Sequence, residues 1–176
     1  MNSQANNSQA NSNLPVQGIV RAKLNEGFAL RLPNNETCFV PIGQLAGYCD
    51  AERFERYDAL GIGDVMEVIV GTASRRPIAS EIKAMEYKAE MGLARGAQVE
   101  FFVVTLSEDG VAVRLLAPVC AKGVSAYIHR SRLDLESYEA LLHDSKECLE
   151  ERVGHGATVA SIRRNEKQRL SIKLAV

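Results

Sequence analysis

The chain contains an internal repeat, and this repeat limits the folds that are open to it. Gly27–Leu32 (GFALRL) returns as Gly110–Leu115 (GVAVRL). Farther along, Val40–Leu45 (VPIGQL) is matched by Ile128–Leu133 (IHRSRL). Matching segments in the same order indicate two copies of one small domain, each of about eighty residues.

The repeat divides the 176 residues into four segments. Residues 1–14 form a tract of Asn, Gln and Ser with almost no apolar side chain to bury, which predicts a disordered tail. The first domain is expected over residues 15–86 and the second over residues 96–176. Residues 87–95, which carry Gly92, are expected to form a short helical or irregular connector between them.

Short apolar runs between turn residues predict five strands in each copy. In the first copy the expected strands are 16–24, 27–32, 37–41, 65–72 and 78–85, with a short helix over 51–60 that follows Asp50 as its N-cap. In the second copy they are 97–106, 110–116, 124–129, 157–163 and 169–174, with a longer helical insert over 135–152 that is expected to pack on the barrel. The last strands are aligned through Ile82-Lys83 and Ile172-Lys173. Five strands with a helix between the third and fourth match an OB-fold, so the predicted fold class is all-β with short helices, as two tandem five-stranded OB-fold barrels.

Alternation along the second strand of each copy separates a core row from an outward row. The outward row carries the same Ala-x-Arg pair in both copies, ending at Arg31 and at Arg114. The predicted core rows are Phe28, Leu30 and Leu32 in the first copy and Val111, Val113 and Leu115 in the second.

Several classes of function lack the residues that they need. The four cysteines show no CxxC spacing and the three histidines do not join them at zinc-finger intervals, so we expect no metal site, no disulfide and no cofactor. There is no Gly-rich phosphate loop, no HExxH and no nucleophile elbow, so the sequence predicts that the protein is not an enzyme. We expect no membrane-spanning segment and no secretory signal, and His155, between two glycines, is expected to be a turn residue. Unpaired thiols then favour the reducing cytoplasm.

Motifs in both copies resemble the S-one RNA-binding motif, which is named after a ribosomal small-subunit protein. In the first copy they are Val16-Gln17-Gly18-Ile19-Val20, Gly27-Phe28-Ala29-Leu30, Phe39-Val40-Pro41-Ile42 and Ile62-Gly63-Asp64-Val65. In the second copy they are Gly110-Val111-Ala112-Val113, Tyr127-Ile128-His129 and Arg169-Leu170-Ser171-Ile172-Lys173. The resemblance covers nearly everything from Pro15 to the C-terminus and implies an OB-fold that binds single-stranded RNA, usually without chemistry.

The resemblance also indicates where this chain departs from the family. Two aromatic residues that flank the Gly-Ala step of the second strand commonly stack on bases in the family. The corresponding positions hold Glu26 and Ala29 in the first copy and Asp109 and Ala112 in the second. The third-strand histidine of the family matches His129, whereas the first copy has proline at position 41. Base stacking is therefore expected to be reduced.

Exposed arginines and aromatic residues define the predicted RNA-binding set. Arg31 with Phe39, and Arg114 with Tyr127 and His129, would supply phosphate contacts and stacking surfaces. Basic loops at one rim would add charge. The full predicted set is Arg31, Phe39, Arg75, Arg76, Arg114, Tyr127, His129, Arg130, Arg132, Arg163, Arg164, Lys167 and Arg169, with the stronger patch in the second copy.

Two functions fit these observations. The first is weak, sequence-tolerant binding of single-stranded RNA, in translation, RNA turnover or post-transcriptional regulation, with a ribosome or an RNA-processing complex as a further partner. The alternative is a protein-interaction scaffold that docks on a ribosome, a polymerase or a nuclease through degenerate barrels and the 135–152 helix. The net charge of −1 and the missing stacking aromatics are the reasons to consider the alternative. The doubled motif with its exposed Arg, Tyr and His side chains favours RNA binding, which is the function that we expect.

Overall fold

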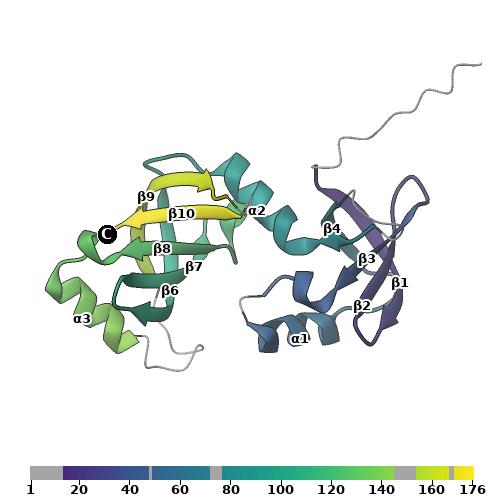
Figure 1. Ribbon diagram of the computed structural model, residues 1–176, viewed down its shortest axis with the longest axis horizontal. Coiled ribbons are helices and arrows are strands. Elements are labelled where there is room, and N and C mark those ends of the chain that lie inside the picture. Colours follow the sequence, from purple (N-terminus) through teal and green to yellow (C-terminus); the bar gives the residue numbers. More distant parts are fainter. Residues whose placement is uncertain (1–13, 48, 72–76, 145–153, 167–168) are drawn as a thin grey trace, which may run out of the picture. The chain divides into compact units, whose positions relative to one another are not determined.

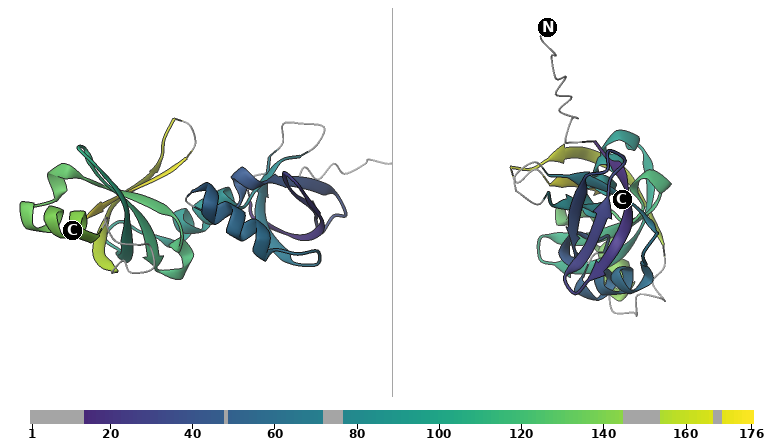
Figure 2. Two further views of the ribbon diagram at one scale, coloured as in Figure 1. Left: turned by 90° about the horizontal axis from the view of Figure 1, so that it is seen from below. Right: turned by 90° about the vertical axis from the view of Figure 1, so that its right-hand side faces the viewer.

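The computed structural model describes residues 14–47, 49–71, 77–144, 154–166 and 169–176 (Figure 1). Its contacts divide the chain into two compact units, Met1–Ala84 (unit 1) and Met85–Val176 (unit 2). Each unit has a hydrophobic core of its own. Figure 2 shows the strongly curved strands of both units from two further directions.

Unit 1 is a nearly closed five-stranded barrel. Its strands are β1 (Val16–Leu24), β2 (Gly27–Arg31), β3 (Thr37–Pro41), β4 (Val65–Val70) and β5 (Ala79–Ser80), hydrogen-bonded in the order β3-β2-β1-β4-β5. Between β3 and β4 lie η1 (Ile42–Gln44) and α1 (Asp50–Ala59). A parallel bridge from Phe39 to Ile78 joins the two outer strands, and the Phe39 N–H donates to the carbonyl oxygen of Pro77 at 2.9 Å.

Unit 2 is a closed barrel with the same arrangement. Its strands are β6 (Gln98–Ser107), β7 (Gly110–Ala117), β8 (Ser125–His129), β9 (His155–Arg164) and β10 (Leu170–Ala175), in the order β10-β8-β7-β6-β9. The short helices η2 (Val119–Ala121) and η3 (Arg130–Arg132) lie on either side of β8, and α3 (Leu135–Asp144) follows η3. Lys173 pairs in parallel with Tyr127, which closes the barrel between β10 and β8. The strand order and the helix between the third and fourth strands confirm the predicted fold class of two tandem OB-fold barrels.

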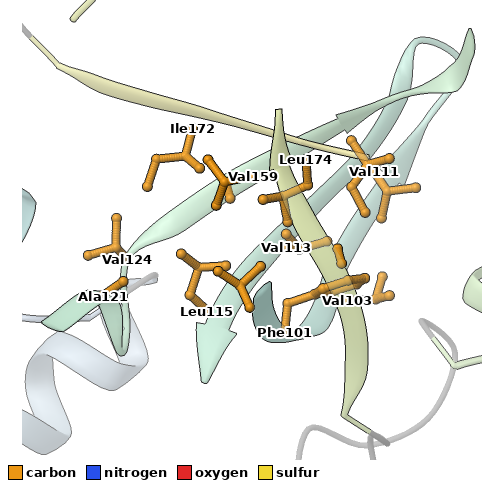
Figure 3. Close-up of a cluster of buried hydrophobic side chains, with 14 of the residues drawn as sticks. Phe101, Val103, Val111, Val113, Leu115, Ala121, Val124, Val159, Ile172 and Leu174 are labelled. Atoms are coloured by element: carbon orange, nitrogen blue, oxygen red, sulfur yellow. The ribbon is translucent and has the colours of Figure 1, made fainter. Parts of the chain in front are cut away.

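The two cores lie on the faces that alternation predicts. In unit 1, Phe28 and Leu30 are fully buried and Leu32 nearly so. In unit 2, the row Val111, Val113 and Leu115 is fully buried and meets side chains from β6, β9 and β10, among them Phe101, Val159 and Leu174 (Figure 3).

The strand predicted over 78–85 is wrong beyond its first residues. Only Ala79–Ser80 pair with β4, and the chain then continues as α2 (Glu81–Gly92). The Ser80 hydroxyl accepts the backbone N–H of Lys83 at 3.1 Å, which is how serine begins a helix, and alanines at 84 and 89 favour helix. Ile82-Lys83 is therefore helical and is not the structural counterpart of Ile172-Lys173 in β10. The expected connector is a helix that begins earlier than predicted.

The other helices differ from prediction at their ends. The N-cap of α1 is Cys49, and the Asp50 carboxylate instead binds the Arg53 guanidinium at 2.8 Å. His155 is not a turn residue, because it begins β9 and its ring stacks on Phe101 with a centroid separation of 5.6 Å.

The insert expected over 135–152 is helical as far as Asp144, and the rest of it lies outside the described residues. Leu141 is buried and Tyr138 packs on the core, as expected, whereas Leu135 stays 65% exposed. The described part of the insert therefore packs on the barrel through some of its apolar side chains only. Over the described residues, no helix has the length and apolar character that a bilayer span requires.

Candidate nucleic-acid interface

Strand register arranges the outward surface of unit 2. Ala112 in β7 pairs with Tyr127 in β8, and Tyr127 pairs with Lys173 in β10, so these three side chains form one row across three strands. Arg114 and His129 stand two positions away on the same outward sides of β7 and β8. We call Ala112, Arg114, Tyr127, His129 and Lys173 the unit 2 face. It combines an aromatic ring, an imidazole and two cations.

The ring of Tyr127 rests on a glycine. A Cβ atom at Gly110 would lie 2.8 Å from the Tyr127 hydroxyl oxygen and 2.9 Å from the carbon that bears it. No side chain could fit there, and the φ angle of +153° at this position also favours glycine. Ala112, directly opposite Tyr127, is too small to cover the ring. The half-buried ring therefore lies over the sheet and keeps part of its surface open to a ligand.

Hydrogen bonds fix the orientation of the His129 ring. Its Nδ1 atom accepts the backbone N–H of Ser131 at 3.2 Å and lies 2.8 Å from the Ser131 hydroxyl oxygen. Because Nδ1 accepts a hydrogen bond from the backbone N–H, the neutral imidazole carries its proton on Nε2. The exposed ring can thus donate one hydrogen bond from Nε2 to a ligand.

A pocket adjoins the unit 2 face where β8, η3, β9 and β10 meet. It has a volume of about 330 Å³ and is lined by His129, Ser131, Arg132, Ala160, Ser161, Lys173 and Leu174. Within the described part of the chain, its lining contains two cations and two hydroxyl groups but no carboxylate. The pocket therefore brings Arg132 and His129, both predicted from the sequence, together with Lys173.

Two of the predicted arginines bind other parts of unit 2. The Arg130 guanidinium donates to the carbonyl oxygen of Leu133 at 2.9 Å and lies 4.3 Å from the ring centroid of Tyr138 in α3. Arg164 binds Glu90 of α2 at 2.6 Å and lies 3.7 Å from a carboxylate oxygen of Glu86. These contacts fasten α3 and α2 to the barrel.

The remaining predicted residues of unit 2 are spread around it. Arg114 is half-buried between Phe102 and Ser125, its pairing partners in β6 and β8. Arg163 and Arg169 are exposed on the β9–β10 side. Lys167 of unit 2, together with Arg75 and Arg76 of unit 1, lies outside the described residues.

Unit 1 carries the corresponding row with different chemistry. Ala29 pairs with Phe39, and Phe39 bridges to Ile78, so Phe39 and Ile78 occupy the places of Tyr127 and Lys173. Phe39 and Ile78 line a groove of about 900 Å³ with Leu24, Ala29, Pro77 and several polar residues. Arg31 is half-buried, pairs with Thr37 and does not line this groove. In the unit 1 row the apolar Ile78 therefore takes the place that Lys173 holds in unit 2, and Lys23 is the cation among the described residues that line the groove.

Sequence reasoning missed Lys173 as a site residue. Its position between Ile172 and Leu174 in a strand is a signal that it points outward, because both neighbours are apolar. Alternation within β10 does not reveal which strand lies beside it. The parallel pairing with Tyr127, which makes Lys173 part of the face, is a long-range feature.

Two groups with shifted pKa values belong to the scaffold. Burial raises the pKa of the Cys38 thiol from 9.0 to about 11. Hydrogen bonds from the backbone and side chain of Ser137 lower the pKa of Asp134, whose carboxylate accepts the Ser137 N–H at 2.7 Å at the start of α3. The described residues contain no group of three or more His, Cys, Asp or Glu placed to hold a metal ion.

Comparison with known proteins adds little to this description. No protein-family model and no curated protein matches the chain. One similar solved structure is a multidomain protein with nucleic acid binding domains from Streptococcus pneumoniae, with 15% identity, a TM-score of 0.31, and coverage of 92% of this chain and 50% of that one. Another is Drosophila Unr, with 15% identity, a TM-score of 0.26, and coverage of 92% and 61%. The chain thus spans less than two thirds of either protein, and its fold assignment depends on its own strand order.

Proposed function

We propose that this protein binds single-stranded RNA through the unit 2 face, as a sequence-tolerant module of the S-one type. The observation that carries the proposal is the row Ala112, Tyr127 and Lys173, with Arg114 and His129 beside it. Bases stack on aromatic rings whatever their identity, and cations bind the phosphates between them. A surface that alternates these two chemistries suits a flexible strand, whose bases and phosphates also alternate.

The face supports modest affinity. One base stacked on an aromatic ring contributes roughly 1–3 kcal/mol, and the face offers one tyrosine and one histidine. Such binding suits a protein that acts on many RNAs in the cytoplasm, in translation, RNA turnover or post-transcriptional regulation, with a ribosome or an RNA-processing complex as a further partner.

The first test is a titration of the full chain into a fluorescently labelled single-stranded RNA of about 12 nucleotides, a length within the range that OB-folds cover. Tyr127→Ala should weaken binding by roughly 5- to 150-fold, which corresponds to the loss of one stacked base. Tyr127→Phe should retain affinity because the ring remains. Anisotropy that stays flat for the unchanged protein at tens of micromolar would refute the proposal.

The two units can be compared in the same titration. Replacing Arg114, Tyr127 and His129 together should weaken binding more than replacing Arg31 and Phe39, because the unit 1 row holds the apolar Ile78 where the unit 2 row holds Lys173. An NMR spectrum of each variant checks that both barrels remain folded. A larger effect from the unit 1 variant would place the interface on the other barrel.

A further inference from the structure

The pocket beside the unit 2 face has the chemistry of an anion site. Arg132 and Lys173 supply two positive charges from different elements, η3 and β10. His129 adds the Nε2 proton that its bonds to Ser131 leave available, and the hydroxyl of Ser161 can donate as well, whereas the Ser131 hydroxyl donates to Nδ1 of His129. No carboxylate among the described lining residues competes for these donors.

A phosphate group fits these donors better than a carboxylate does. Phosphate presents oxygens in several directions, and the pocket holds donors on η3, β8, β9 and β10, which surround the space from more than one side. A guanidinium such as that of Arg132 can bind two phosphate oxygens at once, whereas the Lys173 ammonium acts as a point charge.

The pocket is also placed to receive a phosphate whose base lies on the unit 2 face. Lys173 belongs to both, since it lines the pocket and pairs with Tyr127. His129 likewise lines the pocket and stands two residues from Tyr127 on the same side of β8. In a nucleotide, only the ribose separates the base from its phosphate.

We propose that unit 2 contains a one-nucleotide site, in which Tyr127 stacks on the base and the pocket of His129, Ser131, Arg132, Ser161 and Lys173 binds the adjoining phosphate. This inference rests on the proposed function, because it places the RNA on the unit 2 face. It identifies a nucleoside monophosphate as the smallest ligand of the site. The tyrosine ring binds the base, whatever its identity, and the pocket binds the phosphate.

The test compares adenosine with adenosine 5′-monophosphate in NMR titrations of the full chain. The monophosphate should bind roughly tenfold more tightly or better, the effect of one charge-assisted hydrogen bond. Its resonance shifts should include the backbone signals of Ser131, Ser161 and Lys173. Inorganic phosphate alone should shift the same three signals at higher concentration.

Variants assign the added affinity to the pocket. Arg132→Gln and Lys173→Gln should each lower the affinity for the monophosphate by a larger factor than the affinity for adenosine. Lys122→Gln is a charge-matched control, because Lys122 is exposed in unit 2 and does not line the pocket. Tyr127→Ala should lower the affinity for both adenosine and the monophosphate. Equal affinity of the unchanged protein for the two ligands would overturn the inference.

RNA carrying either a 5′-phosphate or a 5′-hydroxyl identifies the source of the phosphate. Tighter binding of the phosphorylated strand means that the pocket takes a terminal phosphomonoester, and equal binding means that it takes an internal phosphodiester. If RNA binding depends on Tyr127 but not on Arg132 or Lys173, the pocket inference fails while the proposed function stands. If the monophosphate binds at the pocket but no RNA binds, the proposed function fails instead.

Discussion

At the scale of single residues, the largest change of charge between the two rows is at the position in the last strand. Lys173 and Ile78 take the same place in the row beside an aromatic residue, yet one is a cation and the other a 52% exposed apolar side chain. Alternation predicted the buried rows of β2 and β7 correctly because it depends on neighbouring residues only. It could not predict which residue of the last strand meets the third, because that pairing joins residues far apart in the sequence.

The exchange of these residues makes a prediction about salt dependence. If the apolar side chain of Ile78 prevents phosphate binding beside Phe39 in unit 1, then Ile78→Lys should raise the affinity for RNA and make that affinity depend more steeply on salt. Each phosphate contact with a single strand contributes roughly −0.7 to the slope of log K against log salt, so the slope should become steeper by about that amount. Lys173→Ile should make it shallower by a similar amount. Titrations at several salt concentrations measure both slopes, and an unchanged slope in both variants would contradict this role.

The Cys38 thiol predicts a loss of stability at high pH. Its pKa is about 11 in the folded protein against 9.0 for an ordinary cysteine, so the folded state favours the neutral thiol. The contribution of this group is fully present below about pH 9 and is lost as pH rises toward 11, because the unfolded chain releases the proton first. Unit 1 should therefore lose stability over this window, and Cys38→Val should reduce the loss. Urea unfolding followed by NMR at pH 8 and pH 10.5 measures the free energy of unfolding of unit 1 at the two pH values. The control is Cys120→Val, which alters a cysteine of unit 2.

At the scale of elements, α2 is the largest departure from the sequence prediction. An apolar, β-like start at Ile78 suggested a strand, but contacts made after Ser80 favour a helix. The Glu81 carboxylate accepts the Ala46 N–H at 2.8 Å and binds the Arg56 guanidinium at 2.6 Å. Farther along, Glu90 binds Arg164. These partners are distant in sequence, so local patterns could not reveal them. The four other strands of unit 1 and all five of unit 2 were predictable, because their alternation and turn residues are local.

The ion pairs of α2 make a prediction about local opening. Arg164→Gln removes the charge that Glu86 and Glu90 bind, so amide protons in the second half of α2 should exchange roughly tenfold faster with solvent. Arg163→Gln is a matched control, because Arg163 is the exposed neighbour in the same strand. Hydrogen exchange followed by NMR or mass spectrometry measures the exchange rates of the α2 amide protons in the two variants. Equal protection in the two variants would show that the ion pairs do not hold the helix.

At the scale of the whole molecule, both units place a glycine at the same position, where the backbone approaches a neighbouring strand closely. Gly27 and Gly110 each begin the second strand of their barrel, with φ angles of +151° and +153°. A Cβ atom at either position would collide with a backbone carbonyl oxygen, that of Val40 in unit 1 and that of Ile128 in unit 2. The sequence repeat thus preserves a close approach between the second and third strands.

These glycines allow the cooperativity of the molecule to be measured. Gly27→Ala and Gly110→Ala should each destabilise their own barrel by about 2–3 kcal/mol, because a strained φ angle is combined with a backbone collision. Since the two cores share no buried residue, hydrogen exchange should lose protection mainly in the altered unit. Gly43→Ala in unit 1 is the control, because nothing lies within 4 Å of a Cβ atom there. Uniform loss of protection across both units would indicate a single cooperative fold.

The helix α2 belongs to both units, because Glu81 in its first turn binds Arg56 of unit 1 and Ala89, farther along, lies in the core of unit 2. A cut at the boundary between the units, after Ala84, would leave these residues with their own barrels but would divide α2 within its length. Because short isolated helices are marginal in water, each separated half is expected to lose helical structure at the end that the cut creates.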